Sequence, residues 1–443
     1  MKCIETPLHQ HQSSLRIDDD DVRIIRNPNA EEINSQIIHH NHNNSIPLTI
    51  ALLINTMIGA SILNQPYVFG KSGVIGGLIG LIIAGISTWY GVRMLTEAGI
   101  KCNTLEYGTL AFYVFGKNGE ILCDISIVLL SFGSLISYML ILGQTISNIL
   151  TLWGCHKWVC LRSSDVIVGV LFLDTPFCML RRFGNFAWIS VYSTFVMVII
   201  VFFILIGSPL EYKPNAGSVR YFDIRGLISS FGSIIFSVSF TTDNFQAFIS
   251  TEPTLRSIEK WKFITCFATT CGSLSIFILA LAGYLSFRNC TNQNILDNFP
   301  QKRYTFFQVI VCIHHVLGLP TRFVIMRYSF CKLIVGKRSE EIPFILHTFL
   351  TIFLLLSLAF ISGSSESSGL SFTLNFSGGI GGSISCFILP SLIYLKVMPK
   401  GSSLSTAAYL LFIIGIFTVV AIFVESSIRI VENNSIELPE YCD

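Results

Sequence analysis

Charged residues are scarce in this sequence. Lys, Arg, Asp and Glu make up 13% of its 443 residues, whereas soluble domains carry about 25%. Hydrophobic residues reach 51% and aromatic residues 12%. The net charge of +2, without a basic stripe, gives no indication of nucleic-acid binding. Most charges lie between long apolar runs, so the composition predicts an integral protein of the lipid bilayer.

Motifs of enzyme chemistry are also missing. The apolar runs contain no nucleophile–base motif and no phosphate-binding loop. The 13 cysteines are dispersed, and no pair has zinc-site spacing followed by histidine. The sequence therefore predicts a protein that is not an enzyme and has no resident cofactor.

The apolar runs predict an all-α membrane protein with eleven transmembrane helices. Residues 1–45 are polar, which predicts a disordered cytoplasmic tail without a cleavable signal peptide. Residues 46–431 form the predicted membrane domain, and 432–443 a short outer tail. The expected spans are 46–69, 74–95, 120–150, 164–180, 185–207, 226–250, 263–287, 304–327, 343–362, 369–395 and 404–424.

Loop composition predicts the orientation of the chain. Lys and Arg are in excess in the loops that share a side with the N-terminus, which places that side in the cytoplasm. The sequons Asn289-Cys290-Thr291 and Asn433-Asn434-Ser435 then face outward and predict a glycoprotein. The loop cysteines Cys155, Cys160, Cys290 and Cys442 share that face, where disulfides can form. With eleven spans, the C-terminus is extracellular or lumenal.

Two predicted spans are interrupted by small and polar residues. The first has such residues in its middle: Asn55, Thr56, Gly59, Ser61, Asn64, Gln65 and Pro66. The second contains "SVSFTTDN" at 237–244. A break in lipid leaves backbone groups unpaired at several kcal/mol each, so it is expected only where it is buried in protein or lines a wet cavity. A plainer interpretation is that Gly, Ser and Pro mark tight packing or a kink.

The interrupted spans are the first and the sixth of the eleven. That spacing is typical of transporters with a five-plus-five inverted repeat, in which the substrate lies between two broken helices. The N-terminus of a half-helix attracts a carboxylate, and unwound carbonyls accept hydrogen bonds from an ammonium group or coordinate a cation. The pattern therefore favours a site for an α-amino acid.

These motifs resemble a known family. "INTMIGASILNQPYVFGKSG" (54–73) is similar to the first-helix signature of the amino acid/auxin permease superfamily, and the sodium-coupled neutral amino-acid transporter branch is the most similar. "STEPTLRSIEKW" (250–261), "LAGYLSFRNCTNQNILDNFP" (281–300) and "FILPSLIYLK" (387–396) continue the resemblance. Pro320 and Arg327 match the pattern of the eighth helix. The resemblance implies the leucine-transporter architecture and transport of amino acids by alternating access.

The resemblance also implies site residues. Counterparts of the substrate-binding positions are Gly59, Ala60, Ser61 and Ile62 in the first break and Phe240, Thr241 and Thr242 in the second. Asn55 matches an asparagine that helps to bind sodium, and the carbonyl of Ile58 falls at the same cation site.

One departure from the family pattern leaves the coupling ion open. The branch uses a threonine just before the eighth-helix proline, whereas here Pro320 follows His314, His315 and four residues without a hydroxyl. His315 or Asp243 could carry a coupling proton instead, because ionisable groups inside membranes are costly and tend to be functional. The alternatives are a neutral histidine bonded to a carbonyl and a hydrated aspartate. Arg322 is expected to pair with an acidic group or to extend toward the cytoplasmic surface.

Three function classes follow from these patterns. The leading interpretation is a secondary transporter of small neutral amino acids, coupled to sodium or protons or facilitative. The alternative is a nutrient sensor, which binds an amino acid with little or no net transport and signals through its N-terminal tail. A membrane enzyme has no supporting motif. The target is the plasma membrane or a lysosome- or vacuole-like membrane.

Overall fold

The computed structural model describes most of the chain from Asn44 onward. The described residues are 44–57, 59–155, 163–180, 187–213, 216–251, 257–339, 341–364, 369–399, 401–402, 404–432 and 442. The predicted tail up to residue 43, Ile58, Cys160 and the sequon at 433–435 lie outside them.

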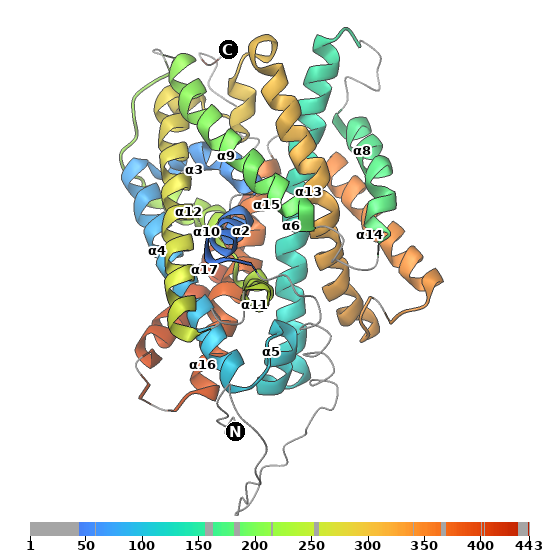
Figure 1. Ribbon diagram of the computed structural model, residues 1–443. Coiled ribbons are helices and arrows are strands. Elements are labelled where there is room, and N and C mark those ends of the chain that lie inside the picture. The colour runs from blue at the N-terminus through green and yellow to red at the C-terminus, as the bar shows by residue number, and fades with distance from the viewer. Residues whose placement is uncertain are drawn as a thin grey trace, which may run out of the picture.

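The described chain is all-helical (Figure 1). Its first part contains α2 (Ile46–Met57), η1 (Ala60–Asn64), α3 (Gln65–Ser72), α4 (Val74–Lys101), α5 (Tyr107–Phe115) and α6 (Lys117–Leu152). Its middle contains α8 (Ser163–Cys178), α9 (Ala187–Leu210), α10 (Ile224–Val238), η3 (Thr241–Asp243), α11 (Asn244–Ser250) and α12 (Ile258–Phe287). After two short turns, η5 (Arg288–Cys290) and η6 (Ile295–Asn298), come α13 (Gln301–Val335) and α14 (Phe344–Ser364). The last part contains α15 (Gly369–Phe376), the π-helical segments η7 (Ser377–Gly382) and η8 (Ile384–Ile388), α16 (Leu389–Val397) and α17 (Ser405–Glu432).

Each predicted span coincides with one or more of these helices. Within the described residues, eight helices are long and apolar enough to cross a membrane, or nine if the bent pair formed by α2 with η1 and α3 counts as one span. With 16 residues, α8 is shorter than a full crossing, and in α9 the apolar stretch found among the described residues is Val198–Leu210. The all-helical membrane fold is thus confirmed, while eleven spans remain a prediction.

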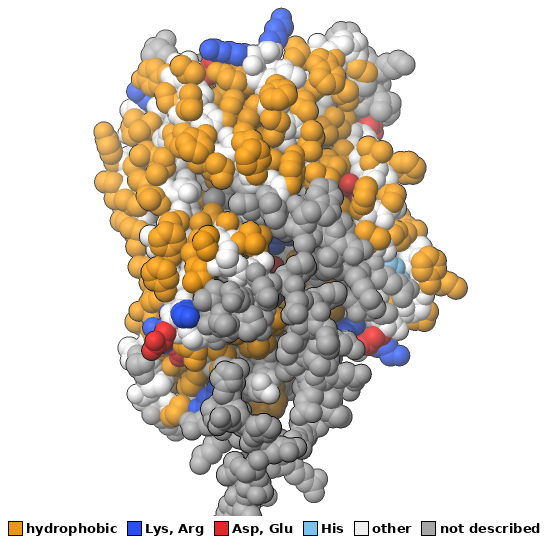
Figure 2. Space-filling view, viewed as in Figure 1, with side chains coloured by type: hydrophobic (Ala, Val, Ile, Leu, Met, Phe, Trp, Pro, Cys, Tyr) orange, Lys and Arg blue, Asp and Glu red, His pale blue; other side chains and the backbone are white. Residues whose placement is uncertain are grey.

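The outer surface of the bundle is apolar, as a lipid-facing surface must be. Exposed Ile, Leu, Phe and Val side chains line α4, α14 and α17, as at Ile82, Phe360 and Phe417. The face shown in Figure 2 carries a broad hydrophobic band, with most of its charged side chains toward the two ends of the molecule. This distribution minimises the burial of charge in hydrocarbon.

The centre of the bundle is closely packed through small residues. A Cβ on Gly232 of α10 would lie 2.0 Å from the carbonyl oxygen of Asn375 in α15, so only glycine allows this approach. The Asn375 amide donates to the Ser229 carbonyl at 2.8 Å, and its Oδ1 accepts from the Ser233 backbone N–H at 3.2 Å. These contacts hold α10 against α15 and η7, while α6 and α13 run together on another side of the core.

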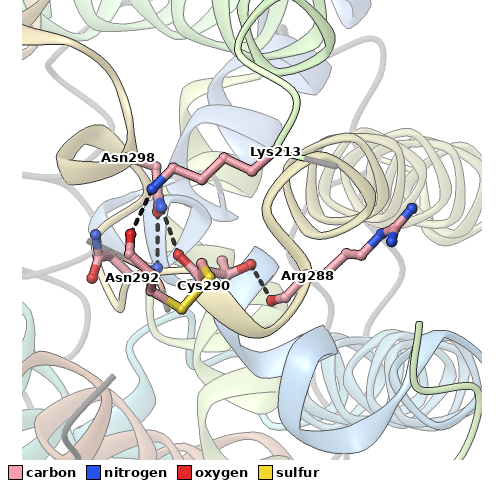
Figure 3. Close-up of a disulfide and its surroundings, with 7 residues drawn as sticks. Lys213, Arg288, Cys290, Asn292 and Asn298 are labelled. Atoms are coloured by element: carbon pink, nitrogen blue, oxygen red, sulfur yellow. Dashed lines mark hydrogen bonds between the residues drawn. A yellow bond between two sulfur atoms is a disulfide. The ribbon is translucent and has the colours of Figure 1, made fainter. Parts of the chain in front are cut away.

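On the predicted outer side, a disulfide ties the C-terminal end of the chain to the turn after α12. Cys290 and Cys442 are bonded, which confirms one expected use of the loop cysteines. Figure 3 shows the surrounding hydrogen bonds: Lys213 donates to the Cys442 carbonyl at 2.7 Å, and the Asn298 amide donates to the Cys290 carbonyl at 2.7 Å. The Asn298 Oδ1 also accepts from the Asn292 N–H at 2.8 Å, so the loop 290–298 is held at several points.

Candidate functional site

The first helix is interrupted where the sequence predicts. Regular α2 ends at Met57, Gly59 takes a non-helical conformation (φ −98°, ψ −148°), and the chain bends by 52° before it continues through η1 into α3. Ser61 in η1 is fully buried, and among the described residues its hydroxyl has no hydrogen-bond partner. A buried hydroxyl without a partner is costly, so Ser61 is available to bind a ligand.

The sixth predicted span is interrupted in a similar way. Regular α10 ends at Val238, and Ser239 is extended (φ −81°, ψ 123°). Phe240 is also non-helical, and η3 begins at Thr241, which is buried beside Cys386. The hydroxyl of Ser239 donates to the Phe236 carbonyl and satisfies one of the acceptors that the break would expose.

The two interrupted helices lie side by side. On one side of the breaks, Thr49 in α2, which precedes the first break, contacts Thr251, which follows α11 and the second break, with 3.2 Å between their hydroxyl oxygens. Nearby, the Asn44 N–H donates to the Ser250 carbonyl at 3.0 Å. On the other side of the breaks, the Gln65 amide of α3 donates to the Ser233 carbonyl of α10 at 3.2 Å. The structure therefore joins the two helices on both sides of their breaks.

Tyr138 of α6 closes one wall of this region. Its hydroxyl oxygen lies 3.7 Å from the position that a Cβ on Gly59 would take, and its ring lies 3.5 Å from the equivalent position on Gly318. The ring also meets the edge of His315, with 4.8 Å between ring centroids. Tyr138 thus stands between the first break and α13.

The predicted cation position has an additional residue that the sequence did not indicate. Ser193 of α9 donates to Asn55 Oδ1 at 3.0 Å and lies 3.5 Å from His314 Nδ1. Three helices, α2, α9 and α13, therefore meet at one polar contact. Nothing in the apolar run around Ser193 distinguishes it from other serines that bond to their own helix, so the sequence carried no signal for this role. Ile58, the other predicted cation residue, lies outside the described part of the chain.

The other expected coupling residues have different surroundings. The Nδ1 of buried His315 lies 2.8 Å from the Val311 carbonyl, which fits a histidine bonded within its own helix. Asp243 at the end of η3 forms an ion pair with Arg322 of α13, with 3.7 Å between Oδ2 and Nη1. Arg322 is thus paired with an acidic group, which was one of the two expected arrangements.

The eighth-helix arginine of the resemblance has structural contacts. Arg327 is completely buried, and its guanidinium donates to the carbonyls of Cys178 and Leu180 and to the hydroxyl of Thr351. Carbonyls at the C-terminal end of a helix lack partners within the helix. Arg327 therefore caps α8 and fixes it to α13 and α14.

The loop that carries the disulfide covers the first break on the predicted outer side. Asn64, the last residue of η1, donates to the Gln293 carbonyl at 2.8 Å. The side-chain oxygen of Gln293 accepts from the N–H of Ser371 in α15, also at 2.8 Å. Gln293 therefore bridges the first break and α15.

Two aspartates outside the spans have shifted pKa values. Asp223 precedes α10, and the N–H of Gly226, followed by nearby Arg220, lowers the pKa of its carboxyl. Asp297 lies in η6 of the covering loop, where burial raises its pKa to about 7.

No group of three or more His, Cys, Asp or Glu suited to a metal ion occurs within the described residues.

Comparisons with known proteins show the family to which the chain is similar. The family model described as "Transmembrane amino acid transporter protein" matches residues 42–432. Vacuolar amino acid transporter 2 of Saccharomyces cerevisiae is 25% identical over 277 residues, which cover 60% of this chain and 57% of that protein. Solute carrier family 38 member 10 of Mus musculus is 24% identical over 373 residues, or 80% of this chain and 33% of that protein. "Putative sodium-coupled neutral amino acid transporter 11" of Mus musculus is 23% identical over 412 residues, or 90% and 89%. The matched part of the chain therefore spans 57% of the length of the first of these relatives and 33% of the length of the second.

Proposed function

Because the chain belongs to the transmembrane amino acid transporter family, we propose that it is a secondary transporter of small neutral amino acids that works by alternating access. The observation that carries this proposal is the pair of interrupted helices, which are joined to each other on both sides of their breaks. This arrangement is expected of a transporter whose first and sixth helices are broken in a five-plus-five repeat of ten helices, followed by an eleventh.

The substrate site is proposed to lie between the breaks. Gly59, Ala60, Ser61 and Ile62 would contribute from the first helix, and Phe240, Thr241 and Thr242 from the second. The N–H groups of η1 would bind the substrate carboxylate, as helix N-termini do. The hydroxyl of Ser61, which has no partner within the described residues, would add a hydrogen bond. Because Tyr138 bounds the proposed site beside Gly59, the site suits a substrate amino acid with a small side chain.

Coupling to sodium is supported by oxygen atoms around Asn55. The Ser193 hydroxyl beside Asn55 Oδ1 supplies the kind of hard oxygen that the eighth helix lacks, and such oxygens are the preferred ligands of hard cations. Asn55, Ser193 and the carbonyl of Ile58 would then hold the sodium ion that accompanies the amino acid.

Coupling to protons is the second arrangement that we propose to test. His315 and Asp243 remain the proposed carriers, and His314 joins them because it lies beside Ser193 at the cation position. A histidine that takes up a proton and a bound sodium ion are both compatible with the contacts around Asn55. The ion gradient that drives transport must therefore be measured.

Uptake into proteoliposomes tests the function. Labelled alanine, glutamine and leucine would be supplied with a sodium gradient alone, a pH gradient alone, or neither. Accumulation of at least one substrate under one gradient supports a coupled transporter, and equilibration without either gradient supports a facilitative one. Binding without any flux would favour the nutrient sensor. The orientation, the outer-face glycosylation at Asn289 and the choice between plasma and vacuole-like membranes are proposals as well; two relatives are named vacuolar.

A further inference from the structure

An ion pair borders the second break, within the predicted membrane-spanning region. Asp243 ends η3, immediately after the non-helical residues 239–240, and Arg322 lies in the interior of α13. Their charged atoms, Oδ2 and Nη1, are 3.7 Å apart. Both side chains are partly exposed, at 22% for Asp243 and 25% for Arg322. Ionisable groups at this depth usually face a water-filled cavity and serve function.

The pair also lies close to the first break. Arg322 interacts with Tyr138, whose hydroxyl faces the backbone of Gly59. Asp243 accepts a second contact from the hydroxyl of Thr242, which is one of the proposed substrate residues. The two charges therefore belong to the wall of the space in which the substrate is proposed to bind.

The chemistry of such a wall depends on the balance between its charges. A carboxylate without a partner would attract the ammonium or guanidinium of a cationic amino-acid side chain. Here the guanidinium of Arg322 occupies that position and repels a second cation. A neutral side chain experiences neither effect. Selectivity by an unfavourable interaction with the wrong ligand is a common device in proteins.

We propose that Arg322 is a specificity-determining residue, which excludes cationic amino acids because it is the built-in counter-ion of Asp243. By the same reasoning, Asp243 excludes anionic amino acids because it balances Arg322. This inference rests on the proposed function, and it explains why the transporter would accept small neutral substrates.

Competition binding on the purified full chain tests the inference without dependence on any gradient. Bound labelled alanine would be displaced by glutamine, lysine or glutamate. Against the wild-type protein, lysine and glutamate should each be at least roughly tenfold weaker than glutamine, the change that one hydrogen bond to a charged group supplies. In Arg322→Gln, lysine should gain about tenfold relative to glutamine. In Asp243→Asn, glutamate should gain by a similar factor.

Two control variants separate specificity from a purely structural role. Arg322→Lys keeps the positive charge and should keep the wild-type order of competitors. The double variant Arg322→Gln/Asp243→Asn leaves no unpaired charge and should lose both gains. If the ion pair only holds the helices together, its removal should lower the thermal stability, or lower the affinity for every amino acid by the same factor. The order of the competitors would then stay unchanged.

The outcomes distinguish this inference from the proposed function. If the wild-type protein binds no amino acid, the proposed function fails. If it binds alanine but lysine competes as well as glutamine, the inference is overturned whatever the variants do. The inference is also overturned if folded Arg322→Gln keeps the wild-type order of competitors. If that variant does not fold, the comparison of lysine with glutamine on the wild-type protein decides.

Discussion

Thr49 and Thr251, which are 202 positions apart in the sequence, place their hydroxyl oxygens 3.2 Å from each other. This contact joins the part of the first helix before its break to the end of the sixth predicted span after its break. The same junction carries the backbone hydrogen bond from Asn44 to Ser250. The two half-helices are therefore expected to move as one unit when the site opens.

The first prediction concerns this junction. Thr49→Val removes the hydroxyl contact and should destabilise the protein by about 1 kcal/mol, the usual net contribution of one hydrogen bond. Because both residues serve one interaction, Thr49→Val/Thr251→Val should be less destabilising than the sum of the single variants. Thermal unfolding of the four proteins measures the coupling, and strictly additive shifts would show that the halves are not joined through these side chains.

The second prediction concerns Ser193. Ser193→Ala removes the hydrogen bond to Asn55 Oδ1 and the contact with His314. We expect gradient-driven accumulation to fall by roughly tenfold, while alanine binding without a gradient changes much less. Ser357→Ala is a matched control, because Ser357 is partly buried on α14 and, among the described residues, donates to the Phe353 carbonyl of its own helix. Equal effects of the two variants on accumulation would remove Ser193 from the coupling site.

The third prediction concerns the disulfide between Cys290 and Cys442, which are 152 positions apart. A bond that closes so long a loop restricts the unfolded chain, so its loss should cost about 2–5 kcal/mol. Cys290→Ser, Cys442→Ser and the double variant should be equally destabilised, since each removes the same bond. Treatment with a reductant should abolish the difference in midpoint between the wild-type protein and the three variants. An unfolding midpoint of the double variant below those of the two single variants would contradict a bond between these two cysteines.

The fourth prediction concerns pH and Asp297. Its pKa in the folded protein is about 7, above the ordinary value of 3.8, so between these values the folded state binds more protons than the unfolded one. Stability that depends on the protonated carboxyl is therefore present at low pH and lost as pH rises through about 7. Asp297→Asn should unfold at nearly the same temperature as wild type below about pH 3.8, and its advantage over wild type should grow as pH rises from there to about 7 and then stay constant. If the two proteins respond to pH identically, Asp297 is not the group responsible.

The sequence was sufficient for the positions of the helices and for the first break. Apolar runs long enough to cross a bilayer predict spans directly, and a polar stretch within such a run leaves few alternatives in lipid. For the same reason, the break around Ser239 and Phe240 could be predicted from "SVSFTTDN".

The contacts that define the candidate site could not be predicted in the same way. Ser193 lies in an ordinary apolar helix, and only the packing of α9 against α2 and α13 brings it to Asn55. The partner of Arg322 depended on how α13 lies against η3, so two arrangements fitted the sequence equally well. The π-helical segments η7 and η8 also have no simple sequence signal, although such segments are frequent near functional sites.

Counterflow is the most direct test of the central claim, which is that one site between the two breaks opens alternately to each side. Proteoliposomes loaded with unlabelled alanine would be diluted into a trace of labelled alanine, with equal sodium and pH on both sides. An alternating-access transporter predicts a transient rise of internal label above its equilibrium level. This rise should be lost in Gly59→Val, where the added side chain would meet Tyr138. Wild-type protein that binds alanine but produces no such rise would contradict the account and favour a sensor.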